Sequence, residues 1–263
     1  MKRPSNINLS DWQLLQKKYR NLEPIVNKIN NNYPIQYLIG NVDFYGYTIK
    51  VNEDVLIPRF ETETLVEKTI DLINKLKLEK ASVLDVGTGS GCISIALKCE
   101  IPTLEITAID KSRKALNIAR KNAKFNKVKI NFICKDLFKY NLVNDYDVII
   151  SNPPYIEEDS DVSPHIKYEP REAIFVKKDN PLIYYEEVLK IALKAVNKNH
   201  LIAFEIDEDH GKDLKELAKK YFKADKIIIE KDLSGKDRYL FIYSKWITFI
   251  SINSYFFIIN TNR

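Results

Sequence analysis

Short apolar runs alternate with helical patterns from Ser82 onward, and this alternation constrains the fold more than any other feature of the chain. Each apolar run has the length of a strand, and the segments between the runs carry apolar residues at the period of a helix. Repeated strand–helix units predict a mainly parallel sheet covered by helices on both faces. The expected strands are 82–86, 104–109, 129–133, 147–150, 201–206, 224–229 and 239–243, and the expected helices are 92–99, 112–125, 181–196 and 212–222.

Further elements are expected at the two ends of this repeat. Only the loop 230–238 separates the last two strands, which predicts an antiparallel hairpin at one edge of the sheet. Residues 11–31 show helical spacing, with Pro24 breaking or starting a helix, and 42–51 alternates apolar and polar residues as a β-hairpin does. Another helix is expected from Glu61. Together the elements predict an α/β protein with a Rossmann-like, seven-stranded, mostly parallel sheet, a small N-terminal helical module and a β-hairpin.

The length of 263 residues allows one large domain and a small extra module. We expect a helical module and linker in 1–40, a β-hairpin linker in 41–60, the α/β domain in 61–244 and an apolar tail in 245–263. The tail is too short to cross a membrane, which needs about 20 apolar residues. It is expected to pack on the domain surface or to be partly ordered.

Charge and cysteine content narrow the possible partners. The net charge of +5 comes from mixed Lys and Glu residues without a block of like charge, so no stable nucleic-acid binding is expected. Cys92, Cys99 and Cys134 form no CxxC pair, which indicates neither a zinc site nor a redox motif, and each is expected to be a small core residue. The odd cysteine count and the absence of a secretion signal are typical of a reducing compartment. We also expect a monomer, free of metal and membrane, in a cytoplasm of bacterial type or in an organelle matrix.

The most informative motif is Ser151-Asn152-Pro153-Pro154-Tyr155, which follows the expected strand 147–150. Two prolines cannot continue a sheet, and the residue before a proline is pushed to extended geometry. Asn152 is therefore expected in a stiff loop at the carboxyl end of a strand, where open α/β sheets bind ligands. Its side-chain amide can hold a planar –NH2 group together with the Pro153 carbonyl, while Tyr155 offers a flat face for stacking. A proline-rich turn without function is the alternative explanation.

A glycine-rich turn, Asp85-Val86-Gly87-Thr88-Gly89-Ser90-Gly91-Cys92, lies between an expected strand and an expected helix. Its glycines allow a tight turn and a close approach of the backbone to a ligand. The dinucleotide fingerprint G-x-G-x-x-G requires glycine at the position of Cys92, which argues against a pyrophosphate cofactor. By itself the turn is a weak indication of any cofactor.

Acidic residues also follow the next two strands. Asp110 ends one strand, where a carboxylate can accept hydrogen bonds from both ribose hydroxyls of an adenosine-type ligand, although it can also cap the helix 112–125. Asp136 can meet an adenine amine while Leu137 packs on the ring, and taken alone a plain turn explains these two residues better. Three strand-end motifs in sequence order together favour cofactor binding.

This combination resembles the class I S-adenosylmethionine-dependent methyltransferases, and most closely the peptide chain release factor glutamine methyltransferases. The resemblance covers roughly 33–243 and also includes Gln36-Tyr37-Leu38-Ile39-Gly40, Leu56-Ile57-Pro58-Arg59 with Glu61-Thr62-Glu63, Glu169-Pro170 and Asp232-Leu233-Ser234-Gly235-Lys236-Asp237-Arg238. The Asn-Pro-Pro-Tyr motif is shared with methyltransferases that act on the exocyclic amine of adenine, whereas the stretch around Pro58 is more specific to the glutamine enzymes. The family usually has a longer N-terminal helical domain, so the module in 1–40 looks shortened.

The resemblance implies that 61–244 is a methyltransferase domain that uses S-adenosyl-L-methionine and leaves S-adenosyl-L-homocysteine. The implied substrate is the glutamine side-chain amide in the Gly-Gly-Gln motif of a peptide chain release factor. Asn152, Pro153 and Tyr155 are the implied catalytic residues, with Pro154 as a further substrate contact, and the Asn152 oxygen and Pro153 carbonyl are expected to accept the two N–H hydrogens of the acceptor. The implied cofactor residues are Asp85, Gly87, Thr88, Gly89, Ser90, Gly91, Asp110, Asp136, Leu137 and Asn152.

The same motifs are compatible with two other functions. A methyltransferase acting on adenine in DNA or RNA is disfavoured because the chain lacks a target-recognition domain and a strong basic stripe. A non-catalytic binding module that kept the fold is disfavoured because the asparagine and glycine motifs are intact, although the short N-terminal module is compatible with it.

Several polar residues receive supporting roles. Arg59 is expected either to shape the cofactor pocket or to pair with Glu61 or Glu63. Glu169-Pro170 is expected to order the connection 157–180, which is long enough to be functional. The histidines are expected to be non-catalytic, with His165 and His210 in solvent and His200 at the start of a strand.

Overall fold

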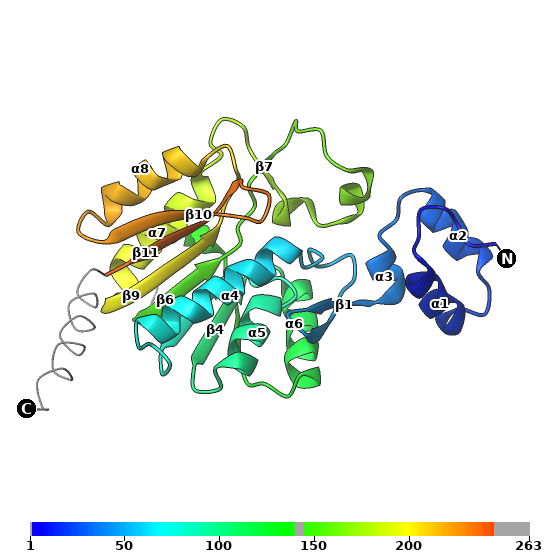
Figure 1. Ribbon diagram of the computed structural model, residues 1–263, viewed down its shortest axis with the longest axis horizontal. Helices are drawn as coiled ribbons and strands as arrows, with labels where there is room; N and C mark the ends of the chain where they lie inside the picture. The colour runs from blue at the N-terminus through cyan, green and yellow to red at the C-terminus, as the bar shows by residue number, and fades with distance from the viewer. Residues whose placement is uncertain (1, 140–144, 245–263) are drawn as a thin grey trace, which may run out of the picture.

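A seven-stranded sheet forms the centre of the computed structural model, which describes residues 2–139 and 145–244 (Figure 1). Its strands are β3 Ser82–Val86, β4 Glu105–Asp110, β5 Asn131–Cys134, β6 Tyr146–Ser151, β9 Val196–Glu205, β10 Lys226–Lys231 and β11 Asp237–Tyr243. Their order across the sheet is β10-β11-β9-β6-β3-β4-β5. β3 to β6 and β9 pair in parallel, whereas β11 runs antiparallel to both β9 and β10. The predicted mostly parallel sheet with an antiparallel edge hairpin is therefore confirmed.

Helices cover both faces of this sheet. They are α4 Phe60–Lys75, α5 Cys92–Glu100, α6 Arg113–Phe125, α7 Ile183–Ala195 and α8 Gly211–Tyr221. Side chains of a strand alternate between faces, so Val83 joins the core with α4, α5 and α6, while the neighbouring Leu84 joins the core with α7 and α8. Parallel strands buried on both faces explain why the sequence shows continuous apolar runs.

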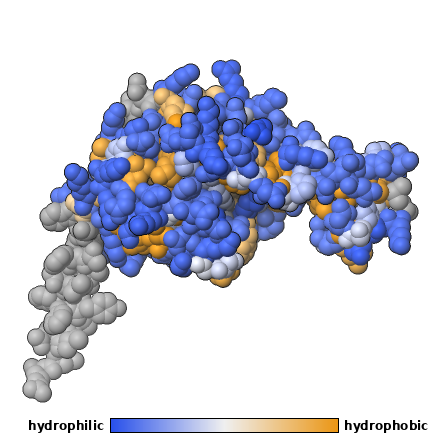
Figure 2. Space-filling view, turned by 90° about the horizontal axis from the view of Figure 1, so that it is seen from above, coloured by the Kyte–Doolittle hydropathy of each residue, from blue (hydrophilic) through white to orange (hydrophobic). Residues whose placement is uncertain are grey.

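A module of three short helices stands off one end of the sheet domain (Figure 1), and it forms a distinct lobe in the space-filling view (Figure 2). The helices are α1 Leu9–Lys18, α2 Glu23–Asn30 and α3 Ile35–Ile39. Trp12, Leu15 and Ile29 are buried in a core of their own. Pro24 lies in the first turn of α2, so it starts that helix rather than breaking it.

A β-hairpin, β1 Asn41–Phe44 and β2 Tyr47–Lys50, connects this module to the sheet domain. Gly46 has a φ of 77° in its turn, a conformation that glycine adopts without strain. Asn122 of α6 fastens the hairpin, because its Oδ1 accepts from the Lys50 N–H at 2.8 Å and its Nδ2 donates to the Lys50 carbonyl at 3.0 Å.

The structure differs from the local predictions in three places. β9 begins at Val196 rather than at 201, because α7 passes into the strand without a loop, so the buried His200 lies inside β9. Cys134 is exposed at the end of the edge strand β5, and Cys99 is only half-buried, so Cys92 alone of the three is a core residue. His165 and His210 are half-buried rather than fully in solvent.

The long connection after β6 contains short elements of its own. β7 Ile156–Glu157 pairs in parallel with β8 Phe175–Val176, and the 3-10 turns η2 Pro164–Tyr168 and η3 Arg171–Ala173 lie between them. The expected apolar tail 245–263 lies outside the described residues. Within the described ranges, no helix is long and apolar enough to cross a lipid bilayer.

Candidate active site

A cavity of about 360 Å³ opens at the carboxyl ends of the central parallel strands. Ligands bind at this end of open α/β sheets. Its lining includes the glycine turn, the residues after β4, β5 and β6, and part of the long connection; among these residues are Gly87, Gly89, Asp110, Asp136, Leu137, Asn152, Pro153, Pro154, Pro170 and Arg171. The structure thus brings the glycine turn and the asparagine loop, which lie 65 residues apart in the sequence (152 − 87), together around one space.

The glycines of the turn have two different surroundings. All three have a positive φ, 75° at Gly87, 55° at Gly89 and 83° at Gly91. Gly87 and Gly89 line the cavity, and a Cβ built on Gly87 has no atom within 4 Å. A Cβ on Gly91 would lie 3.1 Å from the Cβ of Ala119 in α6. The first two glycines therefore leave space for a ligand, whereas the third permits close packing of α6.

Asp85 lies beneath the glycine turn, fully buried, and does not line the cavity. Its Oδ2 accepts hydrogen bonds from the hydroxyls of Thr88 and Ser94, both at 2.6 Å, while its Oδ1 is buried without a partner. Burial raises the pKa of Asp85 to about 6. Thr88, Ser90 and Gly91 are likewise buried behind the lining, so these four predicted cofactor residues support the turn in this structure.

Asp110 lines the cavity at the end of β4. Its Oδ2 accepts from the Gly89 N–H at 2.9 Å and its Oδ1 from the Ser112 N–H at 2.8 Å. Ser112, rather than Asp110, caps α6 by accepting from Ala115. Burial raises the pKa of Asp110. A carboxylate has about four acceptor positions, so Asp110 can also receive two hydroxyl groups.

One wall of the cavity carries Asp136 and Leu137, and Leu137 begins the 3-10 turn η1 Leu137–Lys139. Asp136 accepts from the Phe138 N–H at 3.1 Å. The Phe138 ring meets Tyr184 edge to face at 5.4 Å between centroids, and both rings line the cavity. This wall therefore offers apolar and aromatic surface to a flat ring, with a carboxylate at its edge.

Asn152, Pro153 and Pro154 line the cavity next to the glycine turn, and Tyr155 lies just outside the lining. The Asn152 Nδ2 donates to the Thr62 hydroxyl at 3.0 Å, and the Thr62 hydroxyl donates to Glu205 Oε2 at 2.7 Å. The Tyr155 hydroxyl donates to the other oxygen, Glu205 Oε1, at 3.0 Å. Asn152, through Thr62, and Tyr155, directly, are thus connected to the carboxylate of Glu205.

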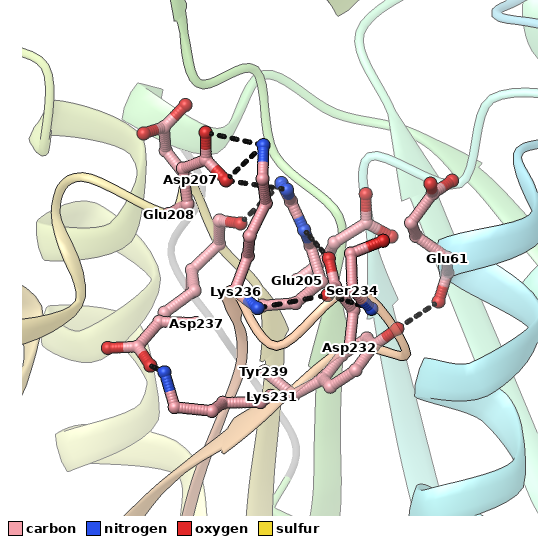
Figure 3. A network of polar contacts seen from close by, with 12 residues as sticks. Glu61, Glu205, Asp207, Glu208, Lys231, Asp232, Ser234, Lys236, Asp237 and Tyr239 are labelled. Atoms are coloured by element: carbon pink, nitrogen blue, oxygen red, sulfur yellow. Dashed lines mark hydrogen bonds and ion pairs between the residues drawn. The ribbon is translucent and has the colours of Figure 1, made fainter.

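Glu205 ends β9 and is 1% exposed. Burial raises the pKa of its carboxyl group, which the hydrogen bonds from Thr62 and Tyr155 and the positive charge of Arg238 oppose. Arg238 is held by the Ile206 carbonyl at 3.2 Å and by Asp232 at 3.4 Å. Figure 3 shows Glu205 beside this network at the turn between β10 and β11. The buried carboxylate therefore has one hydroxyl donor on each oxygen.

Glu169 orders the long connection, as predicted. It is 4% exposed, and its carboxylate accepts from the Ile57 N–H at 3.0 Å and from the Arg59 guanidinium at 2.5 Å. Arg59 thus pairs with Glu169 rather than with Glu61 or Glu63. The following residues, from Pro170 to Ala173, line the cavity, so this ion pair positions one of its walls.

Sequence reasoning did not assign a role at the site to Thr62 or to Glu205. Thr62 stands in the Glu-Thr-Glu stretch of α4, and Glu205 ends an apolar strand. A charged residue at the end of a buried strand is a signal that was available, because charged groups are rarely buried unless they are paired. The partner itself was not visible, since 143 residues separate Thr62 from Glu205.

The cavity fits an adenosine-type cofactor. Gly87 and Gly89 leave the backbone open to a ligand, Asp110 has capacity for two hydroxyl groups, and Leu137 with Phe138 can contact a flat ring. The unpartnered Oδ1 of Asp85 lies beneath the turn and outside the cavity lining, so it is not one of these ligand contacts.

Comparison with known proteins identifies the family. Residues 62–169 match the methyltransferase small domain family. A methyltransferase structure from Pyrococcus furiosus is 17% identical, with a TM-score of 0.53 over 84% of this chain and 95% of that one, which shows a common fold. The release factor glutamine methyltransferase of Flavobacterium psychrophilum is 39% identical over 89% of this chain and 81% of the relative. That of Staphylococcus aureus is also 39% identical, over 81% of this chain and 76% of the relative. The chain belongs to the release factor glutamine methyltransferase family.

Proposed function

We propose that the protein transfers a methyl group from S-adenosyl-L-methionine to the side-chain amide nitrogen of a glutamine in a peptide chain release factor. The main structural support for this proposal is that the Asn152 loop and the glycine turn line one cavity. A cofactor held by the turn thereby lies next to a group suited to hold a planar –NH2 acceptor. The relatives named for this activity support the choice of substrate, and we take the glutamine to be that of the Gly-Gly-Gln motif.

We propose the cavity residues as the cofactor site. Asp110 is placed to hold the ribose hydroxyls, Leu137 and Asp136 to meet the adenine ring and its amine, and Gly87 and Gly89 to let the backbone approach the amino-acid part. Asp85, Thr88, Ser90 and Gly91 would keep the turn in shape from behind. When bound, the sulfonium cofactor supplies an already activated methyl group.

The acceptor amide is the harder partner, because its nitrogen shares its lone pair with the carbonyl and is a weak nucleophile. We assign the Asn152 Oδ1 and the Pro153 carbonyl as acceptors of its two N–H hydrogens. Both point the nitrogen into the cavity and stabilise the positive charge that grows on it, and positioning of this kind is worth ~7 kcal/mol or more. Tyr155 would support the substrate side of the loop. After methyl transfer the nitrogen carries a positive charge, and one of its two protons then passes to solvent water.

Methyl transfer from labelled cofactor tests this function. The purified protein is offered a release factor, the same factor with its Gly-Gly-Gln glutamine changed to alanine, and DNA, in separate reactions. Label on the unaltered factor alone is the expected result. Label on the altered factor would move the methylated position elsewhere, and label on DNA alone would replace the proposed substrate by adenine.

A further inference from the structure

We infer that Thr62 and Glu205 are positioning residues that fix which way the Asn152 side-chain amide faces, so that its oxygen is presented to the acceptor. This inference rests on the proposed function, because it specifies how the acceptor site is set. Neither residue touches the reacting atoms in this scheme. Both act through Asn152.

The three residues form one continuous chain of hydrogen bonds across three elements. Thr62 comes from the first turn of α4, Asn152 from the loop after β6 and Glu205 from the end of β9. The bond from Asn152 to Thr62 is 3.0 Å long and that from Thr62 to Glu205 is 2.7 Å. Thr62 is 3% exposed and Glu205 1%, so solvent has little access to the bond between them, whereas Asn152 faces the cavity.

The number of protons available to Asn152, Thr62 and Glu205 determines which group donates in each hydrogen bond. An ionised carboxylate only accepts, so the hydroxyls of Thr62 and Tyr155, which lie on its two oxygens, must both donate to it. A threonine hydroxyl has one proton, and in Thr62 that proton is committed to Glu205. Its oxygen can then only accept, and the atom of Asn152 that faces it must be the –NH2 nitrogen. The Asn152 oxygen is thereby left for the other side of the amide.

The groups around Glu205 affect whether its carboxyl group is ionised and so accepts both hydrogen bonds. Burial raises the pKa of the Glu205 carboxyl group and Glu61 adds to the rise, whereas the hydrogen bonds from Thr62 and Tyr155 and the positive charge of Arg238 oppose it. The Tyr185 hydroxyl donates to the backbone carbonyl of Glu205 at 3.1 Å and so holds the end of β9 in place. The carboxylate therefore has two hydroxyl donors and a nearby cation to keep it an acceptor.

The orientation of the Asn152 amide matters because the –NH2 group that receives the methyl carries two hydrogen-bond donors. If the Asn152 amide turned by 180°, its own –NH2 would face these donors and the contact would become repulsive. Backbone position alone does not prevent this rotation, since the two ends of a primary amide have almost the same shape. Glu205 and Thr62 fix the orientation of the Asn152 amide. With its oxygen facing the cavity, Asn152 can bind only a methyl-accepting group that donates hydrogen bonds.

Substitutions at Thr62 test the inference. Thr62→Val keeps the shape and removes the hydroxyl, Thr62→Ser keeps the hydroxyl, and Thr69→Val is the matched control. Thr69 lies in the same helix, is also fully buried and donates only to the Leu65 carbonyl at 2.7 Å. We expect kcat on release factor to fall ~10²-fold in Thr62→Val, with KM and cofactor affinity within about threefold. Thr62→Ser and Thr69→Val should stay within about threefold of the parent.

A second readout needs neither substrate nor turnover. In protein labelled with 15N-asparagine, the side-chain –NH2 signal of Asn152 is assigned by its loss in Asn152→Asp. Its proton exchange should be slow in the parent, in Thr62→Ser and in Thr69→Val, and at least ~10-fold faster in Thr62→Val, because a buried hydrogen bond is lost.

The outcomes separate this inference from the proposed function. Equal exchange in Thr62→Val and Thr69→Val overturns the inference, as does an unchanged kcat in Thr62→Val. If the parent protein does not methylate release factor, the proposed substrate is wrong, and the exchange rates alone decide whether Thr62 orients Asn152.

Discussion

Asn152 is the residue on which the proposed chemistry depends most directly. It lines the cavity and is oriented by a bond to Thr62. We expect Asn152→Ala to lower kcat at least ~10²-fold, because one preorganised acceptor is lost, while the dissociation constant for S-adenosylmethionine changes less than about threefold. Single-turnover methylation and a cofactor titration measure the two quantities. Asn131→Ala, an exposed asparagine of β5, is the control, and near-normal turnover of Asn152→Ala would contradict the mechanism.

Asp85 should give the unliganded protein a distinctive pH dependence of stability. Burial raises its pKa from 3.8 to about 6, so the folded state holds the proton more tightly than the unfolded chain does. Its contribution to the free energy of unfolding is therefore largest below pH 4 and is lost as the pH rises through 6. Relative to Asp85→Asn, the parent should lose up to ~3 kcal/mol between pH 4 and pH 7. Urea unfolding at several pH values measures this, and parallel curves for the two proteins would contradict it.

At the scale of elements, the glycine turn connects β3 to α5 and at the same time sets how closely α6 packs. Gly91 has a φ of 83°, and an added Cβ would lie 3.1 Å from the Ala119 Cβ. Gly235 has a similar φ of 81°, but an added Cβ there would have nothing within 4 Å. An alanine at either position would strain the backbone, but only an alanine at Gly91 would also clash with a neighbouring side chain.

We expect Gly235→Ala to lower the free energy of unfolding by ~1 kcal/mol through backbone strain alone. Gly91→Ala should cost ~2–4 kcal/mol, because overpacking against α6 adds to the strain. Chemical denaturation of both variants provides the comparison. Equal losses would mean that α6 moves away freely and that Gly91 has no packing role.

The long connection should depend on Glu169. This buried carboxylate holds Arg59 and the Ile57 N–H, and the residues that follow it form a wall of the cavity. We expect Glu169→Gln to speed proteolysis of the connection and to weaken cofactor binding ~10-fold, because a buried charge-assisted bond is worth ~1.5–3 kcal/mol. Glu158→Gln is the control, since its ion pair with Arg171 is half exposed and 3.6 Å long. Equal cofactor affinity in Glu169→Gln and Glu158→Gln would contradict the prediction, because it would mean that the ion pair between Arg59 and Glu169 does not position the cavity wall.

For the whole molecule, the sequence was sufficient for the fold because strand and helix periodicities are local patterns. The order of the motifs at strand ends likewise predicts that Asp110, Asp136 and Asn152 lie around one space, because the carboxyl ends of parallel strands share one edge of the sheet. Partners far apart in the chain were not predictable, such as Arg59 with Glu169 across 110 residues and Thr62 with Glu205 across 143. Such pairs follow from how helices and loops dock on the sheet, and one local sequence does not encode its distant partner. The exposure of Cys134 escaped prediction for the same reason, since it depends on β5 being an edge strand.

The position of β11 in the sheet affects how the nascent chain folds during synthesis. Although it is the last strand in sequence order, it lies inside the sheet between β10 and β9. A nascent chain that has emerged only as far as β9 therefore leaves the backbone of Leu201 to Glu205 as an unpaired edge, flanked by the apolar side chains of Ile202 and Phe204. Open edges of this kind invite pairing with other chains. Arg238, whose positive charge acts on Glu205, belongs to β11, so a translation product that ends before the final hairpin exposes an open strand edge and also lacks this cation.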